Sequence, residues 1–502
     1  MLRAMPAYDE ARVRWLGDRQ IRSDAAYVLY WMQSARRLDH NHALDYALTQ
    51  ATALRTPLVV YEGLRLDYPW ASHRLHRFVL EGMQANRQAA EALGLTYWPW
   101  VESEPHQGRG LLARLAARAA LVVTDDFPCF IVPRQTARLV SSTAAPVAAV
   151  DGNGVIPLGL LGRPVSAAAH LRPRIHRAFA EAWRHRAAAR PRVSTAAARR
   201  VPPPFDLADL GDLDRLLARL PLDASVPPVA DTPGGSAAAK RRLGRFIKRR
   251  LHGLAEHRST PAALEHSHLS GLSPYLHFGH IGIEEVVARV LAATGPWTPA
   301  RLRPDAVGRR EGFFCTDADV NSFLDQAIVW RDLGLHWHRA RQDDTARLDR
   351  ALPAWALSTL ARHAGDRREH VYDADQWETG ATHDALWNAA QRELVVTGTI
   401  HAYLRMVWGK KVIEWSRTPA EAYATLVHLN NKYALDGRDP NSWTGILWCF
   451  GLFDRPWAPE RPVLGAIRYL SSANTARKFQ LGPYLDYVEA LPRAGRGARP
   501  SQ

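Results

Sequence analysis

The sequence predicts two structural parts: an α/β domain with a parallel, Rossmann-like sheet over residues 1–186, and a larger all-helical domain over residues 234–490. The first prediction comes from short apolar runs, rich in β-branched and aromatic residues, that alternate with helix-period segments. This order is typical of a parallel sheet with helical crossovers. The second comes from helical periodicity that continues to about residue 490. With 502 residues, 47% of them hydrophobic, the chain is long enough for two such cores.

The elements of the first domain can be placed in order. The strands are expected at 27–31, 58–61, 95–98 and 121–124, and the helices at 42–54, 73–92 and 111–119. No GxGxxG motif follows any of these strands, so the usual dinucleotide site is not expected there.

The segment between the two domains has a different composition. Residues 187–233 contain an Ala/Arg-rich stretch and several proline clusters, which predicts a linker with one short helix near 210–220. Ser236 is expected to be the N-cap of a basic helix that ends at about Arg250. Residues 491–502 are rich in Gly, Arg and Pro and are expected to form a disordered tail.

The charge of the chain favours a polyanionic partner. It has 65 basic and 50 acidic residues, a formal net charge of +15 and a pI near 10. Such an excess suits nucleic acid, through counterion release and steering. The alternative is a basic protein from a genome that favours arginine.

Composition also indicates the compartment and excludes several classes of site. The three cysteines lack CxxC spacing, so neither a zinc site nor a disulfide framework is indicated, and no metal is expected. The first 15 residues lack the apolar run of a signal peptide. No stretch approaches the roughly 20 apolar residues that a membrane helix needs. A cytoplasmic, nucleoid-associated protein without membrane contact is expected.

The first motif that suggests chemistry is the string SGLSPYLHFG at residues 270–279. Ser273 followed by Pro274 is typical of an N-cap and a first helical turn. The free N–H groups of such a turn can bind phosphate. Taken alone, a serine-proline cap is common and only weakly indicates a phosphate site.

A second motif is a group of tryptophans in the helical domain: Trp387, Trp408 and Trp415. Trp408 and Trp415 are seven residues apart, so a helix would place them on one face, about 10 Å apart along its axis. Aromatic residues at this spacing usually belong to a core. The residues around them, LWNAAQ and RMVWGKKVIEW, are more distinctive.

Two further segments follow. The sequence LNNKYALDGRDPN at residues 429–441 reads as a polar turn. After it, Trp443, Trp448 and Trp457 cluster with Asp454 and Arg455. Aromatic faces beside cations suit an unstacked base pair extruded from DNA. The alternative is a buried aromatic core.

Together, these motifs resemble the photolyase and cryptochrome family, and most closely its class II cyclobutane pyrimidine dimer photolyases. The resemblance covers nearly the whole chain, including YVLYWMQ at 27–33, NHAL at 41–44 and residues 68–82. It implies that the helical domain binds FAD and that a second, antenna chromophore of unknown identity is possible. DNA containing pyrimidine dimers is the implied partner, and a monomer is expected.

The resemblance also implies roles for individual residues. Trp408 is expected nearest the flavin, then Trp387, with Trp415 outermost and Tyr372 as an auxiliary redox residue. The residues expected to contact FAD are Ser270, Gly271, Leu272, Ser273, Pro274, Leu276, Arg405, Met406, Asn430, Asp436 and Asn441. Either asparagine of the last group could face flavin N5. The residues expected to contact DNA or the lesion are Arg258, Lys410, Lys411, Lys432, Arg438, Trp448, Asp454, Arg455 and Trp457.

Four departures from the family pattern bear on the lesion pocket more than on FAD. Asp332 stands where the family has glutamate, Leu254 where it has tyrosine and Phe453 where it usually has histidine, and residues 334–338 also differ. We expect Asp332 to serve the lesion carbonyls, with burial beside Trp448 raising its pKa. The alternative is that it only pairs with Arg331 or caps a helical turn.

The expected function is therefore repair of cyclobutane pyrimidine dimers by electron transfer from photoexcited reduced FAD. A cryptochrome-like photoreceptor without repair activity is the first alternative. A basic DNA-binding flavoprotein without light chemistry is the second, and the tryptophan group argues against it.

Overall fold

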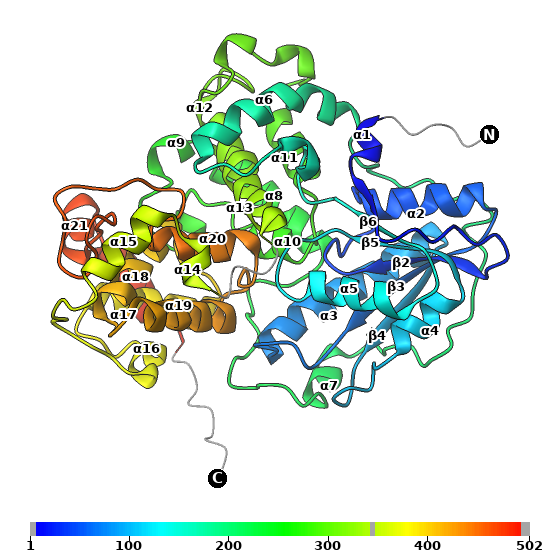
Figure 1. Cartoon of the computed structure of the whole chain (residues 1–502), viewed down its shortest axis with the longest axis horizontal. Helices are drawn as coiled ribbons and strands as arrows, with labels where there is room; N and C mark the ends of the chain where they lie inside the picture. Colours follow the sequence, from blue (N-terminus) through cyan, green and yellow to red (C-terminus); the bar gives the residue numbers. More distant parts are fainter. Residues whose placement is uncertain (1–6, 342–346, 493–502) are drawn as a thin grey trace.

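The computed structural model describes residues 7–341 and 347–492, so most of the expected tail lies outside the described residues. Figure 1 shows a sheet flanked by helices in one part of the molecule and a body of helices in the other. The sheet contains β1 (Val13–Trp15), β2 (Tyr27–Met32), β3 (Leu58–Leu64), β4 (Thr96–Val101), β5 (Ala119–Asp125) and β6 (Val147–Val150). The expected combination of a parallel α/β part and a helical part is confirmed.

The sheet has the strand order β1-β6-β5-β2-β3-β4, and all its pairs are parallel except β1 with β6. After the edge strand β1, the chain enters the centre of the sheet at β2 and builds outward to β4. It then returns to β5 and β6 on the other side of β2, which is the Rossmann-like arrangement. The order therefore reverses between β2 and β5. In open α/β sheets, such a switch point opens a crevice beyond the carboxyl ends of the strands.

Alternate residues of β2 belong to two different cores. Val28, Tyr30 and Met32 pack in one core with α2 (His42–Ala53) and α3 (His73–Leu93). Tyr27, Leu29 and Trp31 pack in the other with α4 (Leu111–Ala117) and α5 (Val132–Ser142). Because both faces are covered, the strand reads as a continuous apolar run.

Helices make up most of the remaining regular structure. Their bounds are α6 Ala168–Arg184, α7 Leu213–Ala218, α8 Ser236–Arg249, α9 Leu254–His257, α10 Ser273–His277, α11 Ile283–Ala292, α12 Ala318–Leu324, a π-helical segment Asp325–Trp330, α13 Arg331–Ala340, α14 Leu348–Ala351, α15 Ala354–Arg362, α16 Ala374–Thr379, α17 Ala385–Thr397, α18 Ala402–Trp415, α19 Pro419–Tyr433, α20 Pro440–Cys449, α21 Ser472–Lys478 and α22 Gly482–Ala490. The N-cap of α8 is Gly235, with φ +88°, and not Ser236 as expected, because the chain enters this helix in a conformation that favours glycine.

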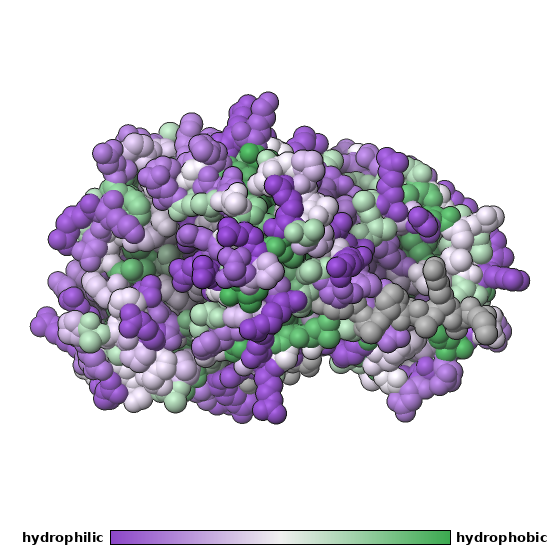
Figure 2. Space-filling model, turned by 90° about the horizontal axis from the view of Figure 1, so that it is seen from above, coloured by the Kyte–Doolittle hydropathy of each residue, from purple (hydrophilic) through white to green (hydrophobic). Residues whose placement is uncertain are grey.

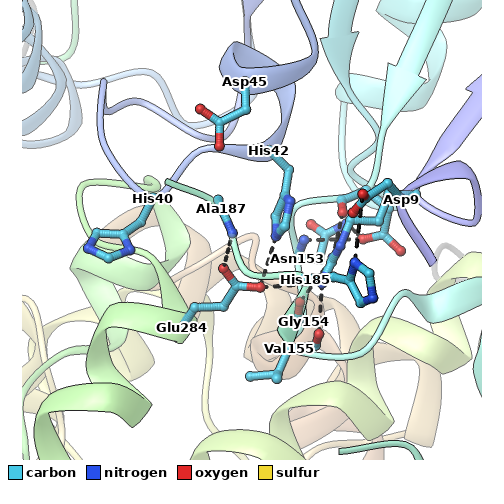
Figure 3. Close-up of polar contacts among 12 residues, drawn as sticks. Asp9, His40, His42, Asp45, Asn153, Gly154, Val155, His185, Ala187 and Glu284 are labelled. Carbon is cyan, nitrogen blue, oxygen red and sulfur yellow. Dashed lines mark hydrogen bonds and ion pairs between the residues drawn. The ribbon is translucent and has the colours of Figure 1, made fainter. Parts of the chain in front are cut away.

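A buried polar network joins the two parts (Figure 3). The Glu284 carboxylate, at the start of α11, accepts hydrogen bonds from the backbone N of Ala187 at 2.9 Å and Arg12 Nη2 at 3.3 Å, and it contacts His42 Nε2 at 2.8 Å. Burial alone would raise the pKa of Glu284, but His42 and Arg12 hold it below its ordinary value. One carboxylate of the helical part therefore binds three segments: the residues just before β1, α2 and the segment that connects the two parts.

A second contact between the parts involves close backbone approach. Gly279, with φ +70°, follows α10, and a Cβ at this position would lie 1.8 Å from the carbonyl oxygen of Ser34. On α3, Arg74 is buried and donates to the carbonyl oxygens of Tyr433 at 2.7 Å and Val395 at 2.6 Å. The first contact holds the segment after β2 against the helical part, and the second holds α3 against it.

Hydrophilic side chains dominate the face of the molecule shown in Figure 2, with smaller apolar patches between them. Among the residues that the structure describes, no helix has both the length and the apolar content to cross a bilayer.

Candidate functional site

The 270–279 string and the 429–441 turn, which are far apart in sequence, meet in space. The string forms the short helix α10, whose N-cap is Leu272, so Ser273 is its first helical residue and not its cap as expected. The Ser273 hydroxyl hydrogen-bonds to Asp436. One turn further along α10, His277 Nδ1 lies 3.3 Å from Asp439 Oδ2. The expected FAD-binding string is thus held against the expected flavin-facing turn.

Arg405 of α18 forms a two-pronged ion pair with Asp436. Its Nη2 lies 2.7 Å from Oδ1 and its Nη1 lies 3.2 Å from Oδ2. Burial raises the pKa of Asp436, but the Arg405 charge and the hydrogen bonds from Arg405 and Ser273 outweigh burial and leave it below its ordinary value. The carboxylate therefore stays ionised, and the pair presents fixed polar edges at this site.

The two asparagines of the turn differ in how firmly they are held. Asn430 is 2% exposed, and its Nδ2 donates to Asn431 Oδ1 and Ser442 Oγ, both at 2.9 Å. Asn441 Nδ2 donates to Asp439 Oδ1 at 3.0 Å. A Cβ at Gly334 would lie 2.7 Å from Asn441 Oδ1, so the departure from the family pattern at Gly334 leaves room beside this amide.

The remaining residues of the FAD set lie on the same elements. Ser270 Oγ accepts from Leu272 N at 3.3 Å, and Gly271 has φ +65°. Leu272 and Pro274 are buried, whereas Ser273 is exposed; Leu276 and Met406 are half-buried.

The donor set fits a flavin dinucleotide. It combines a guanidinium, hydroxyls and neutral amides, which suit the phosphates and the polar edge of the ring. Two buried donors nearby, Asn431 Nδ2 and Trp443 Nε1, have no hydrogen-bond partner among the described residues. A buried donor without a partner is costly, so ligand oxygens would stabilise this arrangement.

A stack of tryptophans starts on α18 beside Arg405. The rings of Trp408 and Trp387 lie 6.2 Å apart at 7°, and Trp387 Nε1 donates to the Trp408 carbonyl oxygen at 3.1 Å. Trp408 Nε1 donates to Gln391 Oε1 at 3.0 Å, so hydrogen bonds fix both rings.

The expected electron order, with Trp415 outermost, stays a prediction, and the structure adds a ring to it beyond Trp387. Trp415 itself is only 3% exposed. Trp377, which was not predicted, lies 4.9 Å from Trp387 and 6.3 Å from Trp415 between ring centroids. It sits on the short helix α16, too short for periodicity to mark it, and an isolated tryptophan in the polar run DQWET was its only signal.

The residues expected to contact the lesion surround Arg468, a cation that was not predicted. We call this group, Trp448, Asp454, Arg455, Trp457 and Arg468, the aromatic wall. The Arg468 guanidinium lies 5.5 Å from the Trp448 ring centroid and 4.2 Å from that of Trp457, and Arg468 Nε is 3.1 Å from Asp454 Oδ2. Arg455 lies over the Trp457 ring at 4.7 Å and is exposed. Aromatic rings and cations are therefore grouped here, as they are in sites where bases stack.

Several basic residues expected to contact DNA are unsuited to that role. Lys410 has no exposed surface and donates to the Cys449 carbonyl oxygen at 2.6 Å, and burial lowers its pKa to about 8. Lys411 is 6% exposed and pairs with Glu414 at 2.7 Å. Lys432 Nζ lies 2.8 Å from Glu378 Oε2. Their positive charge predicted a DNA contact, because the sequence does not show that each lysine has a partner within the protein.

Two expected DNA-contacting arginines have different settings. Arg438 is 2% exposed and donates to the Asn431 carbonyl oxygen at 3.1 Å, so it does not face DNA as expected. Arg258 is half-buried and directly follows α9, whose first residue, Leu254, is buried.

Asp332 is completely buried on α13. Its Oδ1 lies 3.5 Å from Arg331 Nη1, its Oδ2 has no hydrogen-bond partner among the described residues, and a Cβ on Gly154 would be 2.8 Å from that oxygen. Burial raises the pKa of Asp332 to about 7, partly offset by Arg331. The raised pKa was expected, but the carboxyl faces the segment after β6, and a flipped base cannot contact it in this conformation.

A cavity of about 460 Å³ opens at the switch point of the sheet. Trp31, Gln33 and Ser34 line it from the end of β2, and Phe127 and Phe130 from the segment after β5. The helical part contributes the other wall, which consists of His277, Phe278 and Arg438. No ligand contacts for this cavity were predicted from the sequence.

Comparison with known proteins shows which family this geometry represents. No protein-family model matches the chain. In fold, it is similar to a bacterial class III photolyase from Agrobacterium tumefaciens (TM-score 0.63, 18% identity, 93% of this chain and 86% of that one) and a Synechocystis cryptochrome (TM-score 0.62, 15% identity, 92% and 88%).

Curated sequences are closer. The chain is 32% identical to the deoxyribodipyrimidine photo-lyase of Methanothermobacter thermautotrophicus, over 96% of this chain and 98% of the relative. It is also 32% identical to the rice enzyme of the same name, over 92% and 88%. The chain therefore belongs to the deoxyribodipyrimidine photolyase family, and the expected family and enzyme class are confirmed. Membership of class II stays a prediction.

Proposed function

We propose that this protein repairs cyclobutane pyrimidine dimers in DNA with light absorbed by bound, fully reduced FAD, as class II enzymes do. The observation that carries the proposal is the Trp408–Trp387 stack beside the Arg405–Asp436 pair, because it combines a flavin-type polar site with a path for electrons. When bound and photoexcited, reduced FAD supplies one electron, which splits the cyclobutane ring and then returns.

The residues of the two converging motifs would hold the cofactor. We assign Ser270, Ser273 and the start of α10 to the diphosphate, and the Arg405–Asp436 pair to the polar edge of the ring. The neutral amides of Asn430 and Asn441 are assigned to the ring's N5 side, where a carboxylate would disfavour an anionic flavin.

The lesion would bind at the aromatic wall. Trp448 and Trp457 offer ring faces to a base pair extruded from the duplex, and Arg468 between them is held in place by Asp454. Arg455, which is exposed, is the best placed member of this wall to meet a phosphate.

We assign the switch-point cavity to a second chromophore. Its aromatic walls and its position at the carboxyl ends of the strands suit a planar ligand. A Sulfolobus tokodaii photolyase of similar fold contains two FAD molecules. We retain 1–186 and 234–490 as the two domains, with 187–233 as the linker.

The test is a repair assay on dimer-containing DNA with the FAD-loaded protein, in light and in darkness. Light-dependent loss of dimers is expected. A protein that binds FAD and undergoes photoreduction but repairs no dimers would be assigned instead to the cryptochrome-like photoreceptors. A folded protein that takes up no FAD on reconstitution would refute the proposal altogether.

A further inference from the structure

Trp377 connects parts of the aromatic stack that otherwise have no ring contact. It is 2% exposed, and its ring lies 4.9 Å from Trp387, 6.3 Å from Trp415 and 5.2 Å from Tyr372 between centroids. In the described part of the chain, Trp387 has ring contacts with Trp377 and Trp408, and neither Trp415 nor Tyr372 is among them. The shortest ring-to-ring route outward from Trp387 therefore passes through Trp377.

We propose that Trp377 is an electron carrier between Trp387 and two exits, Trp415 and Tyr372. This inference rests on the proposed function, because it needs a photoexcited flavin that takes one electron from Trp408. Trp387 then reduces Trp408, and Trp377 reduces Trp387, one electron at each step. Trp377 in turn regains one electron from Trp415 or from Tyr372.

The surroundings of the two exits favour Tyr372 as the final donor. Lys411 Nζ lies 5.2 Å from the Trp415 ring centroid and 2.7 Å from Glu414 Oε2, and a positive charge so close to the ring disfavours a cation on it. Tyr372 can avoid a cation altogether, because its hydroxyl is hydrogen-bonded to His383 Nδ1.

The hydrogen bond to His383 gives the proton a destination. When Tyr372 loses one electron, its phenolic proton moves to Nδ1, which leaves a neutral tyrosyl radical and a protonated imidazole. The step uses the tautomer of His383 whose proton is on Nε2. His383 is exposed, and His370 stacks on it at 3.7 Å, so the proton can pass on to water. A thiol in solution then returns one electron and one proton to Tyr372 and becomes a thiyl radical.

The experiment is transient absorption and electron paramagnetic resonance on the FAD-loaded protein, wild type and Trp377→Phe. Phenylalanine keeps an aromatic ring in the core but is much harder to oxidise than tryptophan. We expect the yield of long-lived tyrosyl radical to fall by about tenfold or more, which equals about 1.4 kcal/mol of added barrier. Trp377→Tyr, which restores an oxidisable ring, should recover part of the yield.

Trp98→Phe is the matched control. Trp98 is as deeply buried, at 1% exposed, but lies in the sheet against Tyr27 and Phe205 and is not part of the stack. FAD content and melting temperature should change equally in both variants, and only Trp377→Phe should lose the radical. An undiminished radical yield in Trp377→Phe would overturn the proposal.

Two further measurements separate the steps. Tyr372→Phe should abolish the tyrosyl signal while a tryptophan radical still forms, and a persistent tyrosyl signal would overturn this exit. Formation of the tyrosyl radical should slow in D₂O, and an unchanged rate would overturn proton transfer to His383. A wild-type protein that binds FAD but forms no radicals in light would instead refute the photochemistry of the proposed function.

Discussion

Replacing Asp332 with asparagine is expected to stabilise the protein by an amount that increases with pH. The carboxyl is completely buried, and its pKa rises from 3.8 to about 7 in the folded chain. Because the folded chain holds this proton more tightly than the unfolded chain, its stability falls as pH rises from about 4 to about 7. Asparagine is close in size and shape to the protonated acid and carries no charge at any pH.

The pKa shift sets the magnitude. About three pKa units correspond to about 4 kcal/mol above pH 8, as an upper bound. About 2 to 3 kcal/mol of this penalty develops between about pH 5 and about pH 8, since the unfolded carboxyl is already ionised over that range. The gain from Asp332→Asn should therefore be larger at the higher pH by this amount.

Urea unfolding at the two pH values, with FAD saturating, measures the difference. Asp305→Asn is the control, because its side chain is 61% exposed and pairs with Arg303 on the surface. It should alter stability little, and equally at both pH values. A gain from Asp332→Asn that is the same at both pH values, or a loss at the higher one, would refute the assigned burial.

The same position tests the expected lesion contact. Because the buried carboxyl faces the segment after β6, dimer-splitting yield per absorbed photon should be equal in the wild type and in Asp332→Asn, with FAD bound in both. A yield that falls in Asp332→Asn without loss of FAD would restore the expected lesion contact, since a protonated carboxyl can stabilise charge that develops on the lesion carbonyls. Equal yields would leave Asp332 as a structural partner of Arg331.

Other predictions concern the electron path, the cofactor, DNA and the domain interface. Trp408→Phe should block photoreduction of oxidised FAD in steady illumination while FAD stays bound; undiminished photoreduction would remove Trp408 from the path. Arg405→Ala should weaken FAD binding, measured by fluorescence titration, by about tenfold or more. It should also destabilise the chain by about 1 to 3 kcal/mol, because it leaves the half-buried Asp436 carboxylate, 13% exposed, without its ion-pair partner. Arg417→Ala, at an exposed pair, should have neither effect. DNA affinity should fall at least about tenfold between about 50 and about 200 mM salt, and a flat response would contradict a phosphate-dominated interface. Glu284→Gln should lower the free energy of unfolding by about 1 to 3 kcal/mol in a urea titration; no change would mean that the network in Figure 3 contributes nothing.

The sequence predicted the buried strands well because their physical signal is local. β2, β3 and β5 are buried strands that begin with apolar runs, which continue through all of β2 but end before Glu62 in β3 and before Thr124 in β5. β1 and β6 have three and four residues, too few for periodicity to identify them. The starts of α8 and α10 were each predicted one residue late. Ser236 and Ser273 were taken as the N-caps, but the N-caps are Gly235 and Leu272.

The site was predicted less completely because solvation and partners depend on the tertiary structure. Ser273, Arg405 and Asp436 were chosen from motifs, and they meet as expected. Lys410 was expected to contact DNA as a cation in the family-like motif, yet it has no exposed surface and donates to the Cys449 carbonyl oxygen. No local sequence pattern predicted that Arg468 belongs to the site. Its place there depends on the rings of Trp448 and Trp457, which only the tertiary structure brings to it.

The short helix α10 has an optical consequence. Ser273 and His277 contact the turn assigned to the flavin, while His277 and Phe278 also form a wall of the switch-point cavity. Five residues of helix span only about 8 Å. Gly279, which follows α10, lets the backbone lie directly against Ser34, where a Cβ would be 1.8 Å from the carbonyl oxygen. One short helix would therefore border both the assigned flavin site and the assigned pigment cavity, and its position would set the spacing between two light-absorbing molecules.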